Sequence, residues 1–315
     1  MRRAAAVVLV LVLAAAAAGW FLTAADPLTA ADLPRHEPDV ANGERMFYAG
    51  GCTSCHAAPG ARGEDKLHLA GGLGLTSPFG TFRVPNISPD PESGIGGWSD
   101  LDFVNAVMRG VSPDGGHYYP SFPYPSYARM RIEDVLDMKA FIDTLPAVRS
   151  TVAGHDLAFP YSIRRGVGVW KRLNMHPGPV VALAGADPEI ARGQYLVEGP
   201  GHCGECHTPR DALGGARLQQ WLAGAPNPEG RGTIPNITPH ADGIARWSTG
   251  DIAYSLETGF KPDFDSFGGS MVAVQDNMAK LPAEDRAAIA AYLKAVPPLP
   301  NAVTSQARTG AETGG

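Results

Sequence analysis

The longest apolar run of the chain lies at its N-terminus. Two arginines precede an uncharged stretch, and from Ala4 to Leu22 nearly every residue is Ala, Val or Leu. A helix needs about 20 apolar residues to cross a bilayer, whereas the apolar region of a cleaved signal peptide has about 7–15. The length favours a membrane anchor in residues 1–25 over a signal segment that is removed. On either interpretation, the arginines keep the N-terminus in the cytoplasm and the chain from Asp26 onward is exported.

Two stretches of helical periodicity lie far apart in the rest of the chain. Apolar residues recur on one face of each stretch: Ile132, Val135, Leu136, Phe141, Ile142 and Leu145 in the first, and Ala288, Ile289, Tyr292, Leu293 and Val296 in the second. Pro146 follows the first stretch and Pro297 follows the second, and proline ends a helix. The pattern predicts two amphipathic helices that each close a larger unit.

These helices close two copies of an internal repeat. Matching segments, including the cysteine motifs described below, recur at an offset of 149–151 residues: Pro85-Asn86-Ile87-Ser88 with Pro235-Asn236-Ile237-Thr238, Trp98-Ser99 with Trp247-Ser248, and Val107-Met108-Arg109-Gly110 with Leu256-Glu257-Thr258-Gly259. Each copy reads as a helix, a cysteine segment, a long Gly- and Pro-rich loop, a middle helix, a second loop and a final helix. A unit of roughly 110 residues with so much loop has a thin core. We therefore expect a bound cofactor to complete each core.

All four cysteines fall in two pentapeptides of one pattern. These are Cys52-Thr53-Ser54-Cys55-His56 and Cys203-Gly204-Glu205-Cys206-His207. Two thiols at this spacing can form thioethers with the vinyl groups of one haem, and the adjacent histidine can ligate its iron. A zinc site would need the cysteine pairs about 15–20 residues apart, but they are 151 residues apart, and a thiol-redox or disulfide pair would not explain both histidines. The motifs predict two covalent c-type haems, with His56 and His207 as proximal iron ligands.

Composition excludes other function classes. Charged residues make up 18% of the 315 residues, and 26 Lys and Arg against 32 Asp and Glu leave a net charge of −6. Nucleic-acid binding needs clustered basic residues, so this balance disfavours it. No phosphate loop, catalytic triad or dinucleotide-binding glycine pattern stands out. We therefore expect no nucleic-acid partner and assign no catalytic residue.

The residues around the motifs resemble a known family. The segments Asn42–His56, Pro85–Ser88, Arg109–Gly115 and Tyr119–Tyr124 are similar to membrane-anchored dihaem cytochromes c, akin to cytochrome subunits of bacterial periplasmic alcohol and aldehyde dehydrogenases. The resemblance implies an all-α fold, with two tandem cytochrome c domains after an N-terminal transmembrane helix. It implies about three to five helices around each covalent haem, where periodicity alone places about three per repeat.

Domain limits follow from the repeat and the resemblance. We predict an anchor or signal segment (1–25), a first cytochrome c domain (39–148), a linker (149–186), a second cytochrome c domain (187–298) and a disordered tail (299–315). The linker is expected to wrap against a domain rather than swing free. The tail is rich in small and polar residues, which bury too little apolar surface to fold.

The second repeat offers a clear sixth ligand. Met271 follows Gly268-Gly269-Ser270 in the loop between the middle and final helices, where the resemblance places an axial methionine. A methionine sulfur opposite the histidine gives a six-coordinate haem of high potential. We favour Met271 over Met278 as the axial ligand of the second haem, on position.

The first repeat departs from this pattern. Phe122 stands at the position that matches Met271, and phenylalanine cannot ligate iron. Met130 follows eight residues later, just before the final helix, and is our candidate axial ligand for the first haem. Two alternatives stay open: ligation by His117, which we interpret first as an exposed loop histidine, and an iron with an open distal site.

Residues beside the ligands have two possible roles each. Asn86 and Asn236 occupy matched positions and either bind a haem propionate or cap a turn. Pro59 and Pro209 follow the motif histidines, and their carbonyl environment is a candidate for orienting each imidazole.

The leading interpretation is an electron carrier, not an enzyme. Electrons would enter from a periplasmic dehydrogenase and leave to another cytochrome, to quinone or to a terminal oxidase of the respiratory chain, on the periplasmic side of the bacterial inner membrane. The alternative is a dihaem redox enzyme, peroxidase-like or a sulfur-compound dehydrogenase, with an open distal site on the first haem. A thiol-redox or metal-binding module without haem is the third hypothesis.

Overall fold

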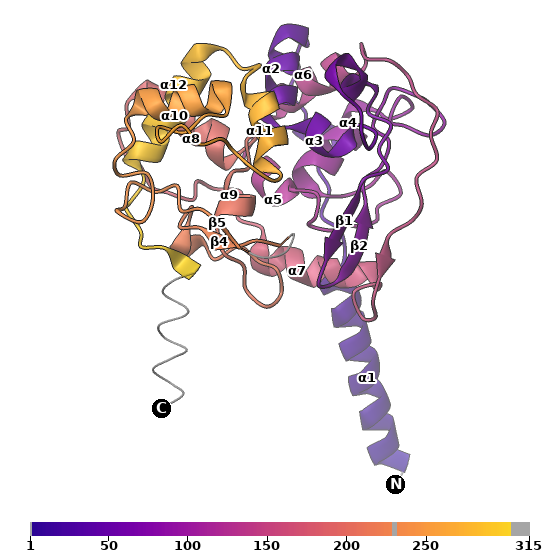
Figure 1. The fold of residues 1–315 in the computed structure, drawn as a ribbon. Helices are drawn as coiled ribbons and strands as arrows, with labels where there is room; N and C mark the ends of the chain where they lie inside the picture. The colour runs from indigo at the N-terminus through magenta and orange to yellow at the C-terminus, as the bar shows by residue number, and fades with distance from the viewer. Residues whose placement is uncertain (1, 229–231, 304–315) are drawn as a thin grey trace, which may run out of the picture.

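The computed structural model describes residues 2–228 and 232–303. Figure 1 shows two helical repeats side by side, with one long helix, α1 (Arg2–Leu22), projecting from the base of the molecule. No residue of α1 is buried, and the helix is long and apolar enough to cross a membrane. A signal sequence has the same features, so α1 fits both interpretations of residues 1–25.

The first repeat is helical, with loops between its helices. Its helices are α2 (Val40–Ala49), α3 (Cys52–His56), α4 (Asp100–Val104), which continues into the π-helical turn η3 (Asn105–Arg109), α5 (Tyr124–Tyr127) and α6 (Ile132–Ile142). The short helical turn η1 (Ala30–Asp32) lies just before the repeat. The loops of the repeat contain the turn η2 (Gly63–His68) and the strands β1 (Gly74–Ser77) and β2 (Gly80–Arg83). The predicted final helix is α6, which ends before Pro146 as the pattern requires.

The second repeat follows the same order. Its helices are α8 (Pro188–Glu198), α9 (Gly204–His207), α10 (Thr249–Thr258), α11 (Met271–Met278) and α12 (Ala283–Ala295), with η5 (Leu218–Gln220), β4 (Ala225–Pro226) and β5 (Thr233–Ile234) between them. Within the described residues each repeat has five α-helices. The prediction of an all-α fold with two tandem repeats is confirmed.

The same local signals start equivalent helices in both repeats. The Asp39 carboxylate accepts hydrogen bonds from N–H groups of the first turn of α2, and Asp187 does the same for α8. Both middle helices begin with a reciprocal capping box, Ser99 with Asp102 at α4 and Ser248 with Asp251 at α10. A side-chain cap contributes roughly 1 kcal/mol. The repeat in sequence therefore becomes a repeat in helix boundaries.

Within each repeat the first and last helices touch through a glycine. A Cβ atom on Gly43 of α2 would lie 2.0 Å from the Asp137 carbonyl oxygen of α6. A Cβ atom on Gly193 of α8 would lie 1.8 Å from the Ala288 carbonyl oxygen of α12. Such distances are far below van der Waals contact, so only glycine lets these backbones pack directly.

The segment between the repeats wraps around the first one. Its strand β3 (Asp156–Leu157) pairs with β2 and extends the β1–β2 hairpin to three strands. After the turn η4 (Arg164–Gly166), helix α7 (Val167–Asn174) brings Lys171 to the first repeat. The Lys171 ammonium donates to the carbonyls of Arg109 and Gly110 at 2.7 and 2.6 Å. The expectation that this segment lies against a domain agrees with these contacts.

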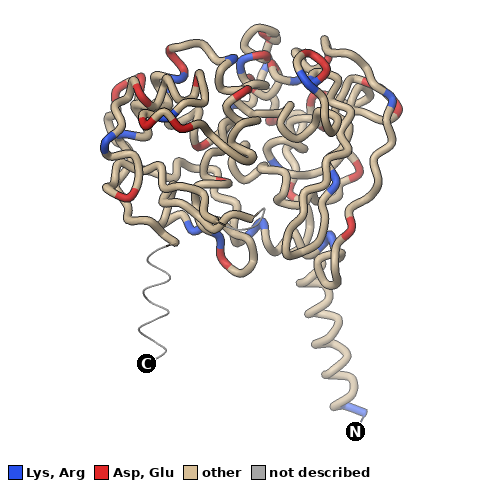
Figure 2. Tube along the Cα trace, in the orientation of Figure 1, with Lys and Arg blue, Asp and Glu red and all other residues tan. Residues whose placement is uncertain are grey.

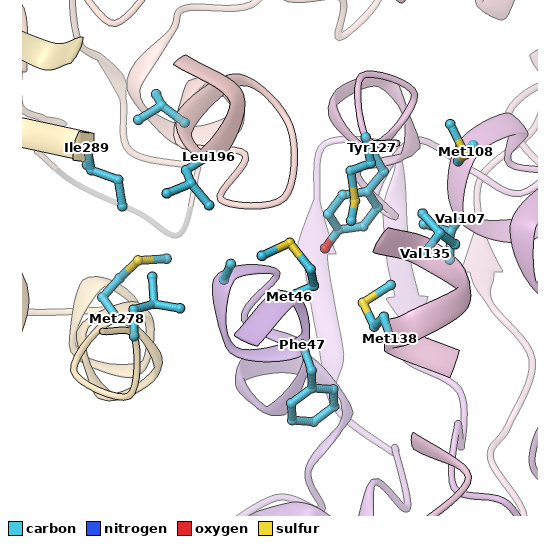
Figure 3. Packing of buried hydrophobic residues seen from close by; sticks show 14 of the residues in the cluster. Met46, Phe47, Val107, Met108, Tyr127, Val135, Met138, Leu196, Met278 and Ile289 are labelled. Carbon is cyan, nitrogen blue, oxygen red and sulfur yellow. The ribbon is translucent and has the colours of Figure 1, made fainter. Parts of the chain in front are cut away.

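The two repeats share one apolar core. Buried side chains from both repeats form a single cluster, which includes Met46 of α2 and Leu196 and Met278 of the second repeat (Figure 3). A shared core ties the repeats together, because separating them would expose apolar surface to water.

A buried ion-pair triad reinforces the junction. The Asp285 carboxylate of α12 has no exposed surface and pairs with Arg45 of the first repeat and Arg192 of the second, the Arg192 Nε lying 2.8 Å from Oδ1. Burial alone would raise the pKa of Asp285, but hydrogen bonds from both arginines outweigh it and hold the pKa below its ordinary value. The charge is thus buried only together with its partners from both repeats.

The predicted tail begins later than expected. Residues 299–303 pack on the second repeat: the Leu299 carbonyl accepts from Asn236 at 2.7 Å, and the Ala302 N–H donates to the Ala223 carbonyl at 3.0 Å. These hydrogen bonds give the first five residues of the predicted tail a defined place, which composition alone does not signal. Residues 304–315 lie outside the described residues.

Candidate haem-binding sites

The structure brings each cysteine motif onto one helical turn. Cys52, Cys55 and His56 lie on α3, and Cys203 precedes the matching turn, α9. Burial and the neighbouring cysteine raise the pKa of the Cys52 and Cys203 thiols to about 12. A redox-active thiol pair needs a lowered pKa, so the thiol-redox hypothesis loses support.

Both motif histidines are oriented by a backbone carbonyl. His56 Nδ1 lies 2.9 Å from the Pro85 carbonyl oxygen, and His207 Nδ1 lies 2.8 Å from that of Pro235. A carbonyl only accepts, so Nδ1 carries the proton and Nε2 keeps its lone pair. Burial lowers the pKa of His56 to about 4 and lowers the pKa of His207, with the carbonyl bond opposing in each case. A neutral imidazole with a free Nε2 is the form that ligates iron.

The orienting carbonyls come from the repeated Pro-Asn-Ile segment, not from the neighbourhood of Pro59 and Pro209. Pro85 and Pro235 lie 29 and 28 residues after the histidines that they orient. No pattern next to the cysteines signals such a contact, although the repetition of the segment marks it as structurally required in both copies.

A repeated tripeptide, which the sequence analysis did not single out, holds this segment in place. Leu-Ala-Gly occurs at 69–71 and again at 222–224. The Gly71 N–H donates to the His56 carbonyl at 2.8 Å, and the Gly224 N–H donates to the His207 carbonyl at 2.8 Å. Gly71 has φ +70, and a Cβ atom there would lie 2.5 Å from the Pro85 carbonyl oxygen. Glycine is therefore required where three backbone segments meet.

Asn86 and Asn236 act as turn-closing residues. The Asn236 Oδ1 accepts from the Thr238 N–H at 2.8 Å, and its Nδ2 donates to the Leu299 carbonyl at 2.7 Å. Asn86 makes the matching bonds with Ser88 and with the Val148 carbonyl. Of the two roles left open, capping the turn is the one that this geometry supports. Each amide fastens the proline segment to the end of its own repeat.

We expect Asn236→Ala to loosen the carbonyl that orients His207. Both ends of a buried amide lose their partners, which costs roughly 1–3 kcal/mol. The free energy of unfolding should fall by that amount, and one of two reduction potentials should shift. Asn86→Ala is the matched control, because it should move the other potential. The interpretation is wrong if both variants move the same potential or neither.

The two methionines of α11 differ in their surroundings. Met278 is buried in the core that both repeats share. Met271 is the first residue of α11 and is partly exposed, so its side chain is not committed to that core. The choice of Met271 over Met278 stays a prediction, and the geometry leaves Met271 available for it.

The distal residues of the first repeat lie among aromatic rings. Phe122 contacts the rings of Tyr118 and Tyr127, with centroids 5.9 and 5.8 Å apart. Met130 is buried in the shared core, and its Cγ lies 3.7 Å from a Cβ built on Gly199 of the second repeat. Met130 as an axial ligand stays a prediction.

The interpretation of His117 as an exposed loop histidine is wrong. The residue is 5% exposed, and its Nε2 lies 2.9 Å from the Thr23 carbonyl just after α1. The loop folds back on the chain leaving α1, a long-range contact that local polarity does not reveal. One ring nitrogen of His117 is thereby engaged by a backbone carbonyl.

The loops that enter the two motifs meet each other. The Tyr127 hydroxyl donates to the Gly50 carbonyl at 3.0 Å, and His202 Nε2 lies 3.2 Å from the same oxygen. The Tyr127 and His202 rings also pack edge to face, with centroids 5.6 Å apart. Gly50 precedes the first motif and His202 the second, so the two cysteine motifs are neighbours across the junction.

Each repeat also braces the helical turn of the other motif. The Thr53 hydroxyl of α3 donates to Asn277 Oδ1 of α11 at 2.8 Å. The Ser126 hydroxyl of α5 donates to Glu205 Oε1 of α9 at 2.6 Å. Helix α11 of the second repeat therefore contacts the first motif, and α5 of the first repeat contacts the second motif. These contacts hold the two motifs in a fixed position relative to each other.

The chain is similar to known proteins over most of its length. The cytochrome c family profile matches it twice, over residues 40–146 and 190–297. The chain belongs to the cytochrome c family. The prediction of two c-type haems as cofactors of this cytochrome is confirmed, since each matched domain contains one attachment motif.

Relatives define the type of cytochrome. It is 55% identical over 300 residues to a diheme cytochrome c-type protein of Cereibacter sphaeroides, a match covering 94% of this chain and 99% of that protein. It is 37% identical over 302 residues to the cytochrome c subunit of a quinone alcohol dehydrogenase of Gluconobacter oxydans, covering 90% of this chain and 61% of the subunit. It is 36% identical over 277 residues to the gluconate 2-dehydrogenase cytochrome c subunit of Pantoea cypripedii, a match covering 84% of this chain and 61% of that subunit.

These relatives are electron-transfer proteins. The cytochrome spans about three-fifths of the two dehydrogenase subunits, and nearly all of the diheme protein. The interpretation of the chain as an electron-transfer protein and not itself an enzyme is confirmed.

Proposed function

We propose that this cytochrome carries electrons from a periplasmic dehydrogenase to the respiratory chain, on the periplasmic side of the bacterial inner membrane. The observation that carries the proposal is the contact between the two attachment sites at Gly50, Tyr127 and His202. Two haems held next to each other by these contacts would allow electrons to pass through the protein from one haem to the other. This arrangement suits an electron carrier better than an enzyme with a single open haem.

The haem-binding residues are proposed from the motif geometry. Cys52 and Cys55 attach the first haem and Cys203 and Cys206 the second. His56 and His207 are the proximal ligands, Met271 is the distal ligand of the second haem, and Met130 is the candidate for the first. When bound, each haem supplies an iron that alternates between the ferric and ferrous states. The chain fixes the proximal imidazoles through the Pro85 and Pro235 carbonyls and surrounds both sites with apolar side chains.

The partners are proposed from the relatives. Relatives named as cytochrome subunits of alcohol, gluconate and fructose dehydrogenases favour a dehydrogenase as electron donor. Another cytochrome, quinone or a terminal oxidase would accept the electrons. A fixed position beside the membrane would keep the cytochrome close to such acceptors.

Helix α1 is proposed to remain as the membrane anchor. Figure 2 shows it without charge between its basic N-terminal end and the folded part. Its last turn and the residues that follow are held by Arg165, Arg172 and His117 of the folded part. Removal of residues 1–25 would leave these three side chains without their hydrogen-bond partners, so the contacts favour a helix that is retained.

Reduced and oxidised spectra, with carbon monoxide added to the reduced form, test the carrier function. The full chain matured with haem should contain two haems, and neither should bind carbon monoxide if Met271 and Met130 close both distal sides. Met271→Ala should open one haem, so that about half of the haem responds. A wild-type protein in which half of the haem already responds would contradict Met130 and favour a reactive first site beside Phe122. No change on Met271→Ala would refute that ligand.

A further inference from the structure

The end of α1 is bound by hydrogen bonds and a cation–π contact to the segment that links the repeats. Arg165 donates to the Trp20 carbonyl at 2.7 Å and to the Thr23 hydroxyl at 2.9 Å, and its guanidinium lies 3.7 Å from the Trp20 ring centroid. Arg172 donates to the Leu22 carbonyl at 2.7 Å. The last carbonyls of a helix lack partners within it and carry partial negative charge, so two arginines stabilise this end.

Helix α7 approaches α1 at backbone distance. A Cβ atom on Gly168 would lie 2.5 Å from the Thr23 carbonyl oxygen. Side chains at this spot are excluded, which fixes the angle between the two helices. Figure 1 shows α7 running across the direction of α1, at the base of the folded part. A bilayer crossed by α1 would therefore have α7 lying along its surface.

The surface presented by this segment is apolar. Five large apolar side chains between 159 and 173 are exposed: Phe159, Tyr161, Ile163, Val169 and Leu173. Phe159 is 81% exposed and Leu173 is 59% exposed. Exposed apolar residues gathered beside a membrane-spanning helix are typical of a surface that dips into the lipid interface.

The charge of the same segment suits an anionic lipid surface. Between Asp156 and Asp187 the chain has no acidic residue but four basic ones. Lys171 is buried against the first repeat, which leaves Arg164, Arg165 and Arg172 at the surface. The whole chain carries a net charge of −6, so this stretch differs sharply from its surroundings. Basic residues near a bilayer are attracted to its anionic headgroups.

We propose that residues 159–173 form a second membrane contact, an interfacial platform that lies in the headgroup layer of an anionic bilayer beside α1. The inference rests on the proposed anchoring by α1. Together with the fixed angle between α1 and α7, the platform would hold the two haem domains at one tilt to the membrane.

Spin-label accessibility in the full haem-loaded chain tests the platform. Leu173→Cys offers a single reactive thiol, because the four native cysteines are used by the haems. Tyr254→Cys on α10 is the matched control, since Tyr254 is also a large exposed side chain, at 55%, but lies in the second repeat. Both variants are labelled with a nitroxide and reconstituted into vesicles of phosphatidylcholine and phosphatidylglycerol.

Collision with oxygen, which concentrates in lipid, is compared with collision with a water-soluble nickel chelate. We expect the ratio of oxygen to nickel collisions to be several-fold higher at position 173 than at position 254. Equal ratios would overturn the platform and leave the surface for a protein partner.

Carbonate extraction of the same vesicles reports on α1 separately. If the protein resists extraction but the two collision ratios are equal, α1 is an anchor and the platform proposal is wrong. If the protein is extracted, the anchor proposal is wrong, and so is the platform proposal that rests on it. The spectra with carbon monoxide depend on neither result, so the carrier function is judged independently.

Discussion

Gly193→Ala is expected to stop the second repeat from folding. The new Cβ atom would lie 1.8 Å from the Ala288 carbonyl oxygen and 2.8 Å from the Tyr292 Cβ. The obstacle is backbone of α12, which cannot turn aside as a flexible side chain would. Overpacking of this kind costs roughly 3 kcal/mol or more, a large part of the stability of a domain. The second haem site should be lost with the repeat, because α9 follows α8 directly.

Gly250→Ala is the control for this substitution. Gly250 also lies in a helix, α10, but a Cβ atom there would meet only the Ser248 hydroxyl oxygen, at 3.6 Å. Alanine gains up to about 1 kcal/mol of helix propensity over glycine, so Gly250→Ala should be neutral or mildly stabilising. Denaturant unfolding followed by circular dichroism, with haem counted per chain, measures both variants. Equal stability of the two would show that α8 and α12 can separate without cost.

The sequence predicts those parts of the molecule that short patterns encode. Both cysteine motifs, the periodic helix α6, the periodic core of α12 and the duplication are local signals, and the structure has each of them where expected. The glycine contacts within the helix pairs are also repeated in sequence, in Asn42-Gly43-Glu44 and Arg192-Gly193-Gln194. Their role becomes visible only when the facing helix is in place.

Contacts between residues far apart in the chain could not be predicted from the sequence. The Pro85 carbonyl reaches a histidine 29 residues away, and the bond between Thr53 and Asn277 spans 224 residues. His117 is polar and lies in a Gly-rich loop, which suggests exposure, yet the chain after α1 covers it. A residue's own type and neighbours carry no information about which distant segment folds over it, so these contacts required the structure.

His207→Ala should lower one of the two reduction potentials while the second haem stays attached. The proposed thioethers to Cys203 and Cys206 would not involve the imidazole, so two haems per chain should still be counted. The iron loses its proximal nitrogen, and axial ligands set haem potentials over roughly 0.8 V, so a fall of about 100 mV or more is expected for that haem. Carbon monoxide should then bind about half of the haem in the reduced protein. His240→Ala is the control, because the His240 imidazole lies beside Asp242 in the loop before α10, and its loss should leave both potentials in place. Two unchanged potentials in His207→Ala would mean that another group ligates the second iron. A fall in the first potential instead would mean that the cross-braced motifs exchange their histidines between repeats. The carbonyl of Pro235, which holds His207 at 2.8 Å, makes the assignment to its own repeat the expected one.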